Sequence, residues 1–260
     1  FLKAVYHLYG HDFIDYQLGT LKRRIQTHAI QLRVDSFDKY CEYVLEKESN
    51  FEEMFKYFSI NVTEFFREPE QLIILKEKIL PYLSSYAHIK IWYAGCSTGE
   101  KVYSLAIILE QMGLLHKTQI YATDFNNEVL QTAANGSYEL ETLDKSYENY
   151  KEYKGIQDFD NYIIKNQYYM KIKDYLKKNI LFFNHNLAID KSMNEFQLII
   201  CENVLIYFNN ALKDKVIKLF DISLCTNGFL MIGKNEYISE NSLTNFNEYT
   251  YNKKVYQKCK

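Results

Sequence analysis

IKIWYAGCSTGEKVYSLA, at residues 89–106, is the stretch that decides the fold. It begins with an apolar run from Ile89 to Ala94, which is short enough for a buried strand. Gly95 and Gly99 then predict a tight turn. After the turn, apolar residues recur every three or four positions, as on one face of a helix: Val102, Leu105, Ala106 and Leu109. The stretch therefore predicts a strand, a glycine turn and a helix.

The glycine turn is a candidate ligand site, because glycine lets the backbone approach a ligand and the following helix offers unpaired N–H groups. A plain strand-to-helix connection is the alternative at this point. The spacing G-x-x-x-G matches neither the dinucleotide fingerprint nor the phosphate loop, so NAD and ATP are not favoured. Glu100 places a carboxylate where a pyrophosphate would sit, which favours a ligand with hydroxyls or a cation there.

Composition narrows the class of protein. The chain has 260 residues, of which 47% are hydrophobic, enough for one large α/β domain or a domain with a smaller companion. The net charge of -2 gives no general argument for nucleic acid binding. The five cysteines contain no C-x-x-C pair and the histidines show no ligand spacing, which predicts neither disulfides nor a metal site.

Localisation is predicted from the same features. No apolar run approaches the roughly 20 residues that span a bilayer, and free cysteines suit a reducing compartment. We therefore expect a soluble, cytoplasmic protein. Because residue 1 is Phe, residues that precede it in the natural chain are an open possibility.

The first 60 residues predict a small helical domain. Apolar residues at helical spacing predict one helix over about 15–32, and others over 37–45 and 51–58. The first helix carries Lys22, Arg23, Arg24 and His28, which we assign to its solvent-facing surface. This basic surface is either an ordinary solvated face or a surface that attracts an acidic partner.

NVTEFFREPEQ, at residues 61–71, contains a candidate ligand residue. Asn61 or Thr63 predicts a helix start, and Pro69 fits a first helical turn. Arg67 follows two phenylalanines that would hold its guanidinium, so it is a candidate clamp for a carboxylate. A surface arginine paired with Glu64 or Glu68 is the alternative.

A second strand, at residues 119–124, ends in Asp124, and a helix capped by Asn126 follows. An acid at this place can accept hydrogen bonds from ribose hydroxyls, and a helix cap is the simpler alternative. Taken with the glycine turn, Asp124 favours a ligand that contains a nucleoside.

The α/β rhythm stops at about residues 137–178, which predicts a small inserted subdomain. It resumes with strands at 179–183 and 196–201, a helix over 211–224, and last strands at 228–233 and 249–258. Glu202 and Asn203 lie at the carboxyl end of the strand 196–201, the edge where open parallel sheets bind ligands.

Several of these motifs, in this order, resemble the motif set of the CheR-type chemotaxis receptor methyltransferases: NVTEFFRE, YAGCSTGEKVYSLA, ATDFNNEVL, HNL and CENVLIYF. GFLMIGKNE and the LKRR run at residues 21–24 resemble further parts of the family, so the resemblance covers essentially the whole chain. It implies a class I S-adenosylmethionine-dependent methyltransferase, with a Rossmann-like, mostly parallel sheet and an antiparallel last strand. A helical domain at 1–60 would precede a methyltransferase domain at 61–260 with an inserted β subdomain.

The resemblance also implies the activity. A methyl group would pass from S-adenosylmethionine to glutamate side chains on the cytoplasmic helices of chemoreceptors, leaving S-adenosylhomocysteine, without a metal. The protein would be a monomer that works beside membrane-bound receptor arrays. Positions that match family cofactor contacts are Asn61, Thr63, Arg67, Gly95, Glu100, Asp124, Asn186, Leu187, Glu202 and Asn203. Positions that match the reaction centre are Arg67, Tyr207 and Arg24.

This chain departs from the family pattern near its site. Lys101 and Val102 follow Glu100 where the family has Glu-Glu-Pro, and Glu202 replaces the arginine of C-R-N. His28 stands where a second basic residue is usual. A negative charge at Glu202 would repel an incoming glutamate.

Alternative functions follow from these departures. One is a cofactor-binding sensor or adaptor whose transferase activity is weakened or lost because of Glu202. A nicotinamide oxidoreductase is a distant third, since the glycine spacing is wrong. A further hypothesis is that residues 162–172 of the insert offer an edge strand to a receptor tail peptide.

Overall fold

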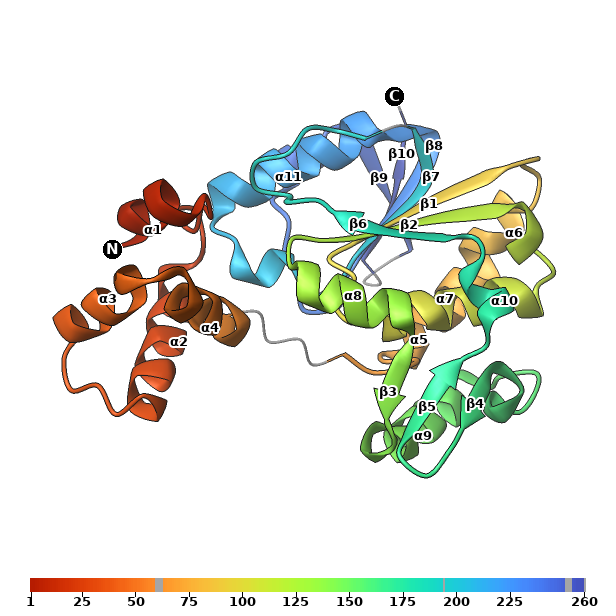
Figure 1. Ribbon diagram of the computed structural model, residues 1–260. Helices are drawn as coiled ribbons and strands as arrows, with labels where there is room; N and C mark the ends of the chain where they lie inside the picture. Colours follow the sequence, from red (N-terminus) through yellow and green to blue (C-terminus); the bar gives the residue numbers. More distant parts are fainter. Residues whose placement is uncertain (59–62, 194, 251–253, 260) are drawn as a thin grey trace.

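The computed structural model describes residues 1–58, 63–193, 195–250 and 254–259. Within these residues the central sheet has seven strands in the order β6-β2-β1-β7-β8-β10-β9 (Figure 1). Their bounds are β1 Ile89–Ala94, β2 Thr118–Asp124, β6 Ile180–Asn184, β7 Phe196–Cys201, β8 Leu224–Ile232, β9 Phe246–Thr250 and β10 Val255–Lys258. The strands β6, β2, β1, β7 and β8 run parallel. β10 is antiparallel to both β8 and β9, so the predicted antiparallel last strand is confirmed.

One strand prediction is wrong. Residues 249–258 do not form a single strand, because β9 ends at Thr250 and β10 begins at Val255 as its antiparallel partner. Strand-forming residues lie on both sides of the chain reversal, so the sequence pattern does not mark it.

Helices cover both faces of the sheet. On one face lie α5 (Pro69–Ile74), a π-helical stretch (Leu75–Ile79), α6 (Leu80–Leu83), α7 (Glu100–Gln111) and α8 (Asn127–Asn135), and on the other lies α11 (Asn210–Ser223) (Figure 1). The residues of β1 serve two cores because side chains alternate along a strand. Ile91 packs in the α7 cluster, whereas Trp92 packs in the α11 cluster, and both are fully buried. This two-sided burial explains why β1 is apolar almost throughout.

The N-terminal helices form a domain with its own apolar core. They are α1 (Leu2–Tyr9), α2 (Leu18–Gln31), α3 (Phe37–Glu46) and α4 (Glu48–Phe58). Our sequence prediction missed α1, whose apolar pattern is interrupted by Lys3 and His7. The predicted helix start at Thr63 is also wrong: α5 begins at Pro69, and Asn61 lies outside the described residues.

The predicted basic surface of α2 is only half correct. Arg24 and His28 are 8% and 1% exposed, whereas Lys22 and Arg23 are exposed. Leu21, Arg24 and His28 follow one another at spacings of three and four, so they share the inward face of the helix. The Nδ1 atom of His28 lies 2.9 Å from the hydroxyl of Tyr40, and burial lowers the pKa of His28.

The insert combines a small sheet with a helix. β3 (Ser137–Glu139), β5 (Tyr169–Ile172) and β4 (Ile163–Lys165) form an antiparallel sheet in that order, with α9 (Leu143–Tyr153) beside it and α10 (Asp174–Lys177) after it. Because β5 is the central strand, only β4 offers an edge within residues 162–172. Figure 1 shows this unit beyond the helices of one sheet face, away from the N-terminal domain.

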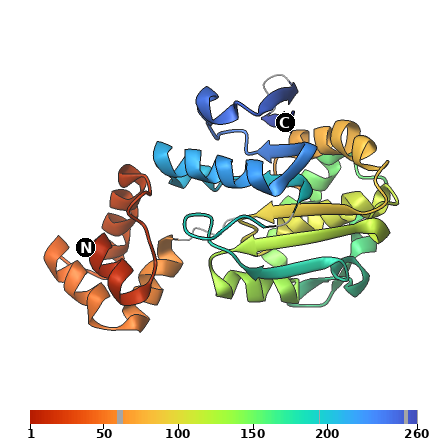
Figure 2. The ribbon, with the colours of Figure 1, turned by 90° about the horizontal axis from the view of Figure 1, so that it is seen from above.

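Figure 2 shows the helical domain to one side of the sheet. Backbone hydrogen bonds attach this domain to the loop after β7. Tyr16 and Phe208 form an isolated antiparallel bridge, and the backbone N–H of Gln17 donates to the carbonyl of Tyr207 at 2.8 Å. Asn209 donates its own N–H to the carbonyl of Asp15 at 2.9 Å. These bonds hold α2 against the carboxyl ends of the parallel strands. In the described ranges no helix is long and apolar enough to cross a bilayer.

Candidate active site

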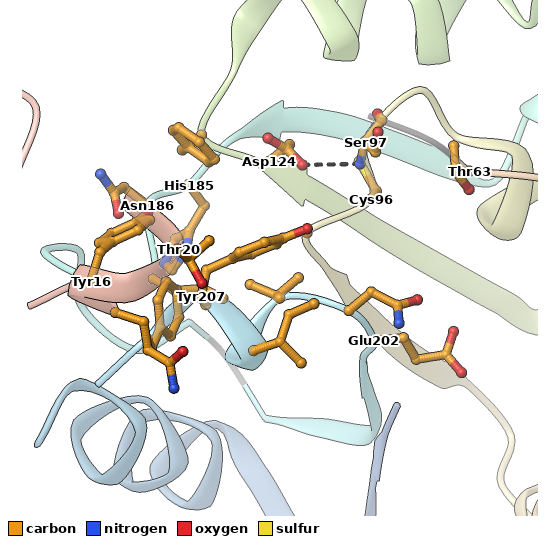
Figure 3. A pocket seen from close by; sticks show the side chains of 18 of the residues that line it. Tyr16, Thr20, Thr63, Cys96, Ser97, Asp124, His185, Asn186, Glu202 and Tyr207 are labelled. Carbon is orange, nitrogen blue, oxygen red and sulfur yellow. Dashed lines mark hydrogen bonds between the residues drawn. The ribbon is translucent and has the colours of Figure 1, made fainter. Parts of the chain in front are cut away.

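A cavity lies where the carboxyl ends of β1, β2 and β7 meet the helical domain (Figure 3). Most of the residues predicted for the site line it together: Arg24, Thr63, Arg67, Gly95, Asp124, Asn186, Leu187, Glu202, Asn203 and Tyr207. Glu100 does not line it, and Asn61 lies outside the described residues. The structure thus brings together residues that are up to 183 positions apart in the chain, from Arg24 to Tyr207.

The glycine turn forms one wall of the cavity. Gly95 has φ of 75°, and a Cβ there would collide with the side chain of Val204, so a side chain is excluded on two grounds. The N–H groups of Gly95 and Cys96 both donate to the carbonyl of Thr123 at 2.8 Å. These bonds attach the turn to the end of β2 and fix the position of Asp124.

Asp124 is both a structural acceptor and a cavity residue. Its Oδ2 accepts the N–H of Ser97 at 2.9 Å (Figure 3). Its Oδ1 accepts the N–H of Asn126 at 3.0 Å. Burial raises the pKa of Asp124, and the backbone donors act against this shift. A carboxylate has about four acceptor positions. Asp124 can therefore join the turn to the start of α8 and still accept hydrogen bonds from a ligand.

Glu100 is buried in the first turn of α7 and does not reach the cavity. Its Oε2 accepts the hydroxyl of Thr98 at 2.7 Å, and burial raises its pKa to about 7. The next residue, Lys101, lines the cavity instead. Sequence reasoning noted Lys101 only as a departure from the family pattern, and that departure was the signal that could have identified it.

We expect Glu100→Gln to stabilise the protein at pH 8 by about 2–3 kcal/mol and to leave stability unchanged near pH 4. The pKa of Glu100 is higher in the folded protein than in the unfolded chain. Its contribution to the free energy of unfolding is therefore fully present below the pKa of the unfolded chain, and it is lost as the pH rises through about 7. Urea unfolding at both pH values tests this, with the exposed Glu110→Gln on the same helix as control. A gain of equal size at both pH values would contradict it.

Lys101 and Glu202, which both depart from the family pattern, form an ion pair. Lys101 Nζ lies 2.9 Å from Glu202 Oε2, and their side chains are 9% and 3% exposed. The hydroxyl of Tyr93 donates to the same oxygen at 2.7 Å. Lys101 neutralises the charge of Glu202, so the repulsion expected of an unpaired Glu202 is not supported by the structure.

Two of the residues predicted for the reaction centre, Arg24 and Tyr207, contact each other in the cavity. The guanidinium carbon of Arg24 lies 4.5 Å from the centre of the Tyr207 ring. Within the described residues no hydrogen bond to the side chain of Arg24 is found, and its Nε is buried without a partner. Arg67 lines the same cavity and follows Phe65 and Phe66, which are fully buried; its role as a carboxylate clamp stays a prediction.

The loop after β6 supplies the predicted pair Asn186 and Leu187. Asn186 accepts the N–H of Ala188 on its side-chain oxygen at 2.9 Å, and its own N–H donates to Asp190 at 2.7 Å. These local bonds shape the loop that reaches the cavity. Tyr16, Phe125 and His185 also line the cavity and were not predicted. The chain has 24 tyrosines and 17 phenylalanines, so the sequence gives no signal that distinguishes a cavity-lining aromatic residue from the others.

Glu236 is a buried carboxylate that holds the loop after β7. Its Oε1 accepts the N–H groups of Val204 and Leu205 at 2.9 and 2.7 Å, and its Oε2 accepts that of Gly233 at 2.6 Å. The short 3₁₀ turn that it anchors, Leu205–Tyr207, carries Tyr207 into the cavity. Glu236 lies in the quoted motif GFLMIGKNE, but nothing in the sequence shows that two of its partners, Val204 and Leu205, are 32 and 31 residues away.

We expect Glu236→Gln to destabilise the fold by about 1–3 kcal/mol. The NH₂ group of the glutamine would face at least one of the three backbone N–H groups, so that hydrogen bond would be lost. The methyl transfer expected from the sequence should fall as well, since Tyr207 loses its anchor. Chemical unfolding and a transfer assay test this, with the exposed Glu240→Gln as control. If the variant matches the wild type in both measurements, Glu236 does not hold the loop.

Comparison with known proteins identifies the family. The model described as "CheR methyltransferase, SAM binding domain" matches residues 61–255, and that described as "CheR methyltransferase, all-alpha domain" matches residues 1–59. The chain is 36% identical to "Putative methyltransferase Cher3" of Pseudomonas putida, over 91% of this chain and 87% of that protein. It is 32% identical to a chemotaxis protein methyltransferase of Borreliella burgdorferi, over 92% and 87%. It is 30% identical to one of Listeria innocua, over 96% and 95%. The chain therefore belongs to the CheR methyltransferase family and has the fold of a class I S-adenosylmethionine-dependent methyltransferase.

Proposed function

We propose that this protein transfers a methyl group from S-adenosylmethionine to glutamate side chains of chemoreceptor cytoplasmic helices. The observation that carries the proposal is the buried guanidinium of Arg24. It lies over Tyr207 in the cavity, and within the described part of the chain no carboxylate pairs with it. A buried charge without a partner costs several kcal/mol, so the site favours an anionic group. A substrate carboxylate supplies that anion.

The residues present fit the cofactor by their chemistry. Asp124 offers carboxylate oxygens at the end of β2, where ribose hydroxyls can donate, and the glycine turn lets a ligand approach its backbone. Thr63, Arg67, Asn186, Leu187 and Asn203 supply further groups around the same cavity. When bound, the cofactor supplies an electrophilic methyl group on a sulfonium.

The protein needs little acid–base chemistry for this reaction. The acceptor glutamate has an unperturbed pKa of about 4.3, so it is ionised at neutral pH and needs no general base. Orientation is the main task, and holding two reactants in attack geometry can lower a barrier by about 7–11 kcal/mol. Arg24 and Arg67 orient the carboxylate. Tyr207 keeps Arg24 in place, and the backbone carbonyl of Tyr207 accepts the N–H of Gln17.

The location and the partner belong to the same proposal. The protein acts in the cytoplasm as a monomer, on receptors whose arrays lie at the membrane. Lys22 and Arg23 are exposed on α2, beside the cavity-lining Thr20 and Arg24. Positive charges at this place attract acidic receptor helices and raise the rate of association.

The test is methyl transfer from labelled S-adenosylmethionine to a receptor cytoplasmic fragment. We expect label on the fragment as an alkali-labile ester, and no label when the acceptor glutamates are replaced by alanine. Cofactor binding without transfer, with transfer restored by Glu202→Arg, would favour the sensor or adaptor function. Absence of cofactor binding would refute both functions.

A further inference from the structure

We infer that Lys101 and Glu202 together bind the amino-acid head group of the cofactor's methionine moiety. The inference rests on the proposed function and adds Lys101 as a binding residue. The head group is a zwitterion with one carboxylate and one ammonium. The ion pair presents one charge of each sign to the cavity, which is the complementary set.

The pair is held firmly by its neighbours. Lys101 Nζ donates to Asn203 Oδ1 at 3.2 Å as well as to Glu202 Oε2 at 2.9 Å. Tyr93, which lies in β1 before the glycine turn, donates to Glu202, whereas Lys101 comes after the turn. All four of these side chains line the cavity. The two charges are therefore oriented before any ligand binds, which reduces the entropy cost of binding.

Each partner has hydrogen-bonding capacity left for a ligand. An ammonium has three N–H donors, and within the described residues two of those of Lys101 are used. Among the described residues, Tyr93 and Lys101 both donate to Oε2 of Glu202. Its Oε1 therefore remains available as an acceptor. Lys101 can donate to the carboxylate of the head group while Glu202 accepts from its ammonium.

The position of the pair agrees with this assignment. Asp124, the proposed ribose contact, lies at the end of β2, and Figure 3 shows Glu202 well apart from it. The glycine turn connects the two places: the N–H of Ser97 in the turn donates to Asp124, and Lys101 follows Gly99 by two positions. A ligand whose ribose is at Asp124 extends its opposite end toward the pair. A buried ion pair is often no more stabilising than apolar residues of similar size, so stability alone gives no reason for it.

Calorimetric binding of two ligands tests the inference. S-adenosylhomocysteine carries the head group, whereas 5′-methylthioadenosine has the same nucleoside and thioether without it. We expect Lys101→Met and Glu202→Gln each to weaken S-adenosylhomocysteine binding about 30-fold and to change 5′-methylthioadenosine binding less than about threefold. The matched control is Lys258→Met, which breaks the Lys258–Asp221 ion pair outside the cavity lining and should change neither affinity.

A double variant keeps the test valid if the single variants fold poorly. Lys101→Glu combined with Glu202→Arg reverses the pair but still offers one charge of each sign. We expect its preference for S-adenosylhomocysteine over 5′-methylthioadenosine to be within about fivefold of that of the wild type. Equal losses for both ligands, or a folded double variant without the preference, would overturn the inference. A wild type that binds neither ligand would instead refute the proposed function.

Discussion

Replacing Arg24 with alanine should lower kcat/KM for methyl transfer about 10²- to 10³-fold and leave S-adenosylhomocysteine affinity within about threefold of the wild type. Arg24 is buried over Tyr207, and no hydrogen bond to its side chain is found within the described residues. Removing a charged group that contacts a buried substrate carboxylate typically costs about 2–5 kcal/mol. Because the proposed contact is with the acceptor rather than the cofactor, we expect the loss of kcat/KM without a matching loss of cofactor affinity.

The neighbouring residue provides a matched control. Arg23 precedes Arg24 on α2 but is exposed, so Arg23→Ala should change kcat/KM only through weaker steering, by a few-fold and less at high salt. Arg24→Lys should recover part of the activity, since lysine keeps the charge but not the planar fork that stacks on Tyr207. Wild-type activity in a folded Arg24→Ala variant would contradict the proposed acceptor site.

Replacing Asp124 with alanine should weaken S-adenosylhomocysteine binding about 100-fold and destabilise the fold by about 2–4 kcal/mol. The first effect follows from the loss of charged acceptors for ribose. The second follows because the buried N–H of Asn126 and the partly buried N–H of Ser97 lose their acceptor. Titration calorimetry and urea unfolding measure the two effects separately.

A second aspartate separates ligand binding from stability. Asp12 accepts the backbone N–H of Ile14 at 2.9 Å in the helical domain and does not line the cavity. Asp12→Ala should therefore cost some stability without changing cofactor affinity. If Asp124→Ala destabilises the protein but binds S-adenosylhomocysteine normally, Asp124 is only a structural acceptor, and the helix-cap alternative is correct.

The ion pair changes the meaning of the unusual residues near the site. Taken one at a time, Lys101 disturbs the expected cofactor contacts and Glu202 repels the substrate. In the structure Lys101 Nζ and Glu202 Oε2 are 2.9 Å apart, so the two departures compensate each other electrostatically. The main reason for expecting a protein without transferase activity is therefore weaker than the sequence suggested.

Local patterns predicted most of the fold. The turn after β1, the helix after it and the cap at Asn126 each depend on residues close together in the chain. For the same reason the sequence did not mark the reversal between β9 and β10, or the inward orientation of Arg24. Polar residues on a helix were assigned to solvent, whereas Arg24 is covered by Tyr207 from a distant loop.

The sequence by itself determined the strand, glycine turn and helix at residues 89–106, the family, and ten of the residues that line the cavity. These depend on backbone preferences and motif identity, which are local. Only the tertiary structure decided that Lys101 rather than Glu100 faces the cavity, that Glu202 is neutralised, and that Glu236 holds the loop of Tyr207. Each of those outcomes depends on a side chain meeting a partner from another element, and the free energy of a buried charge is set by that partner.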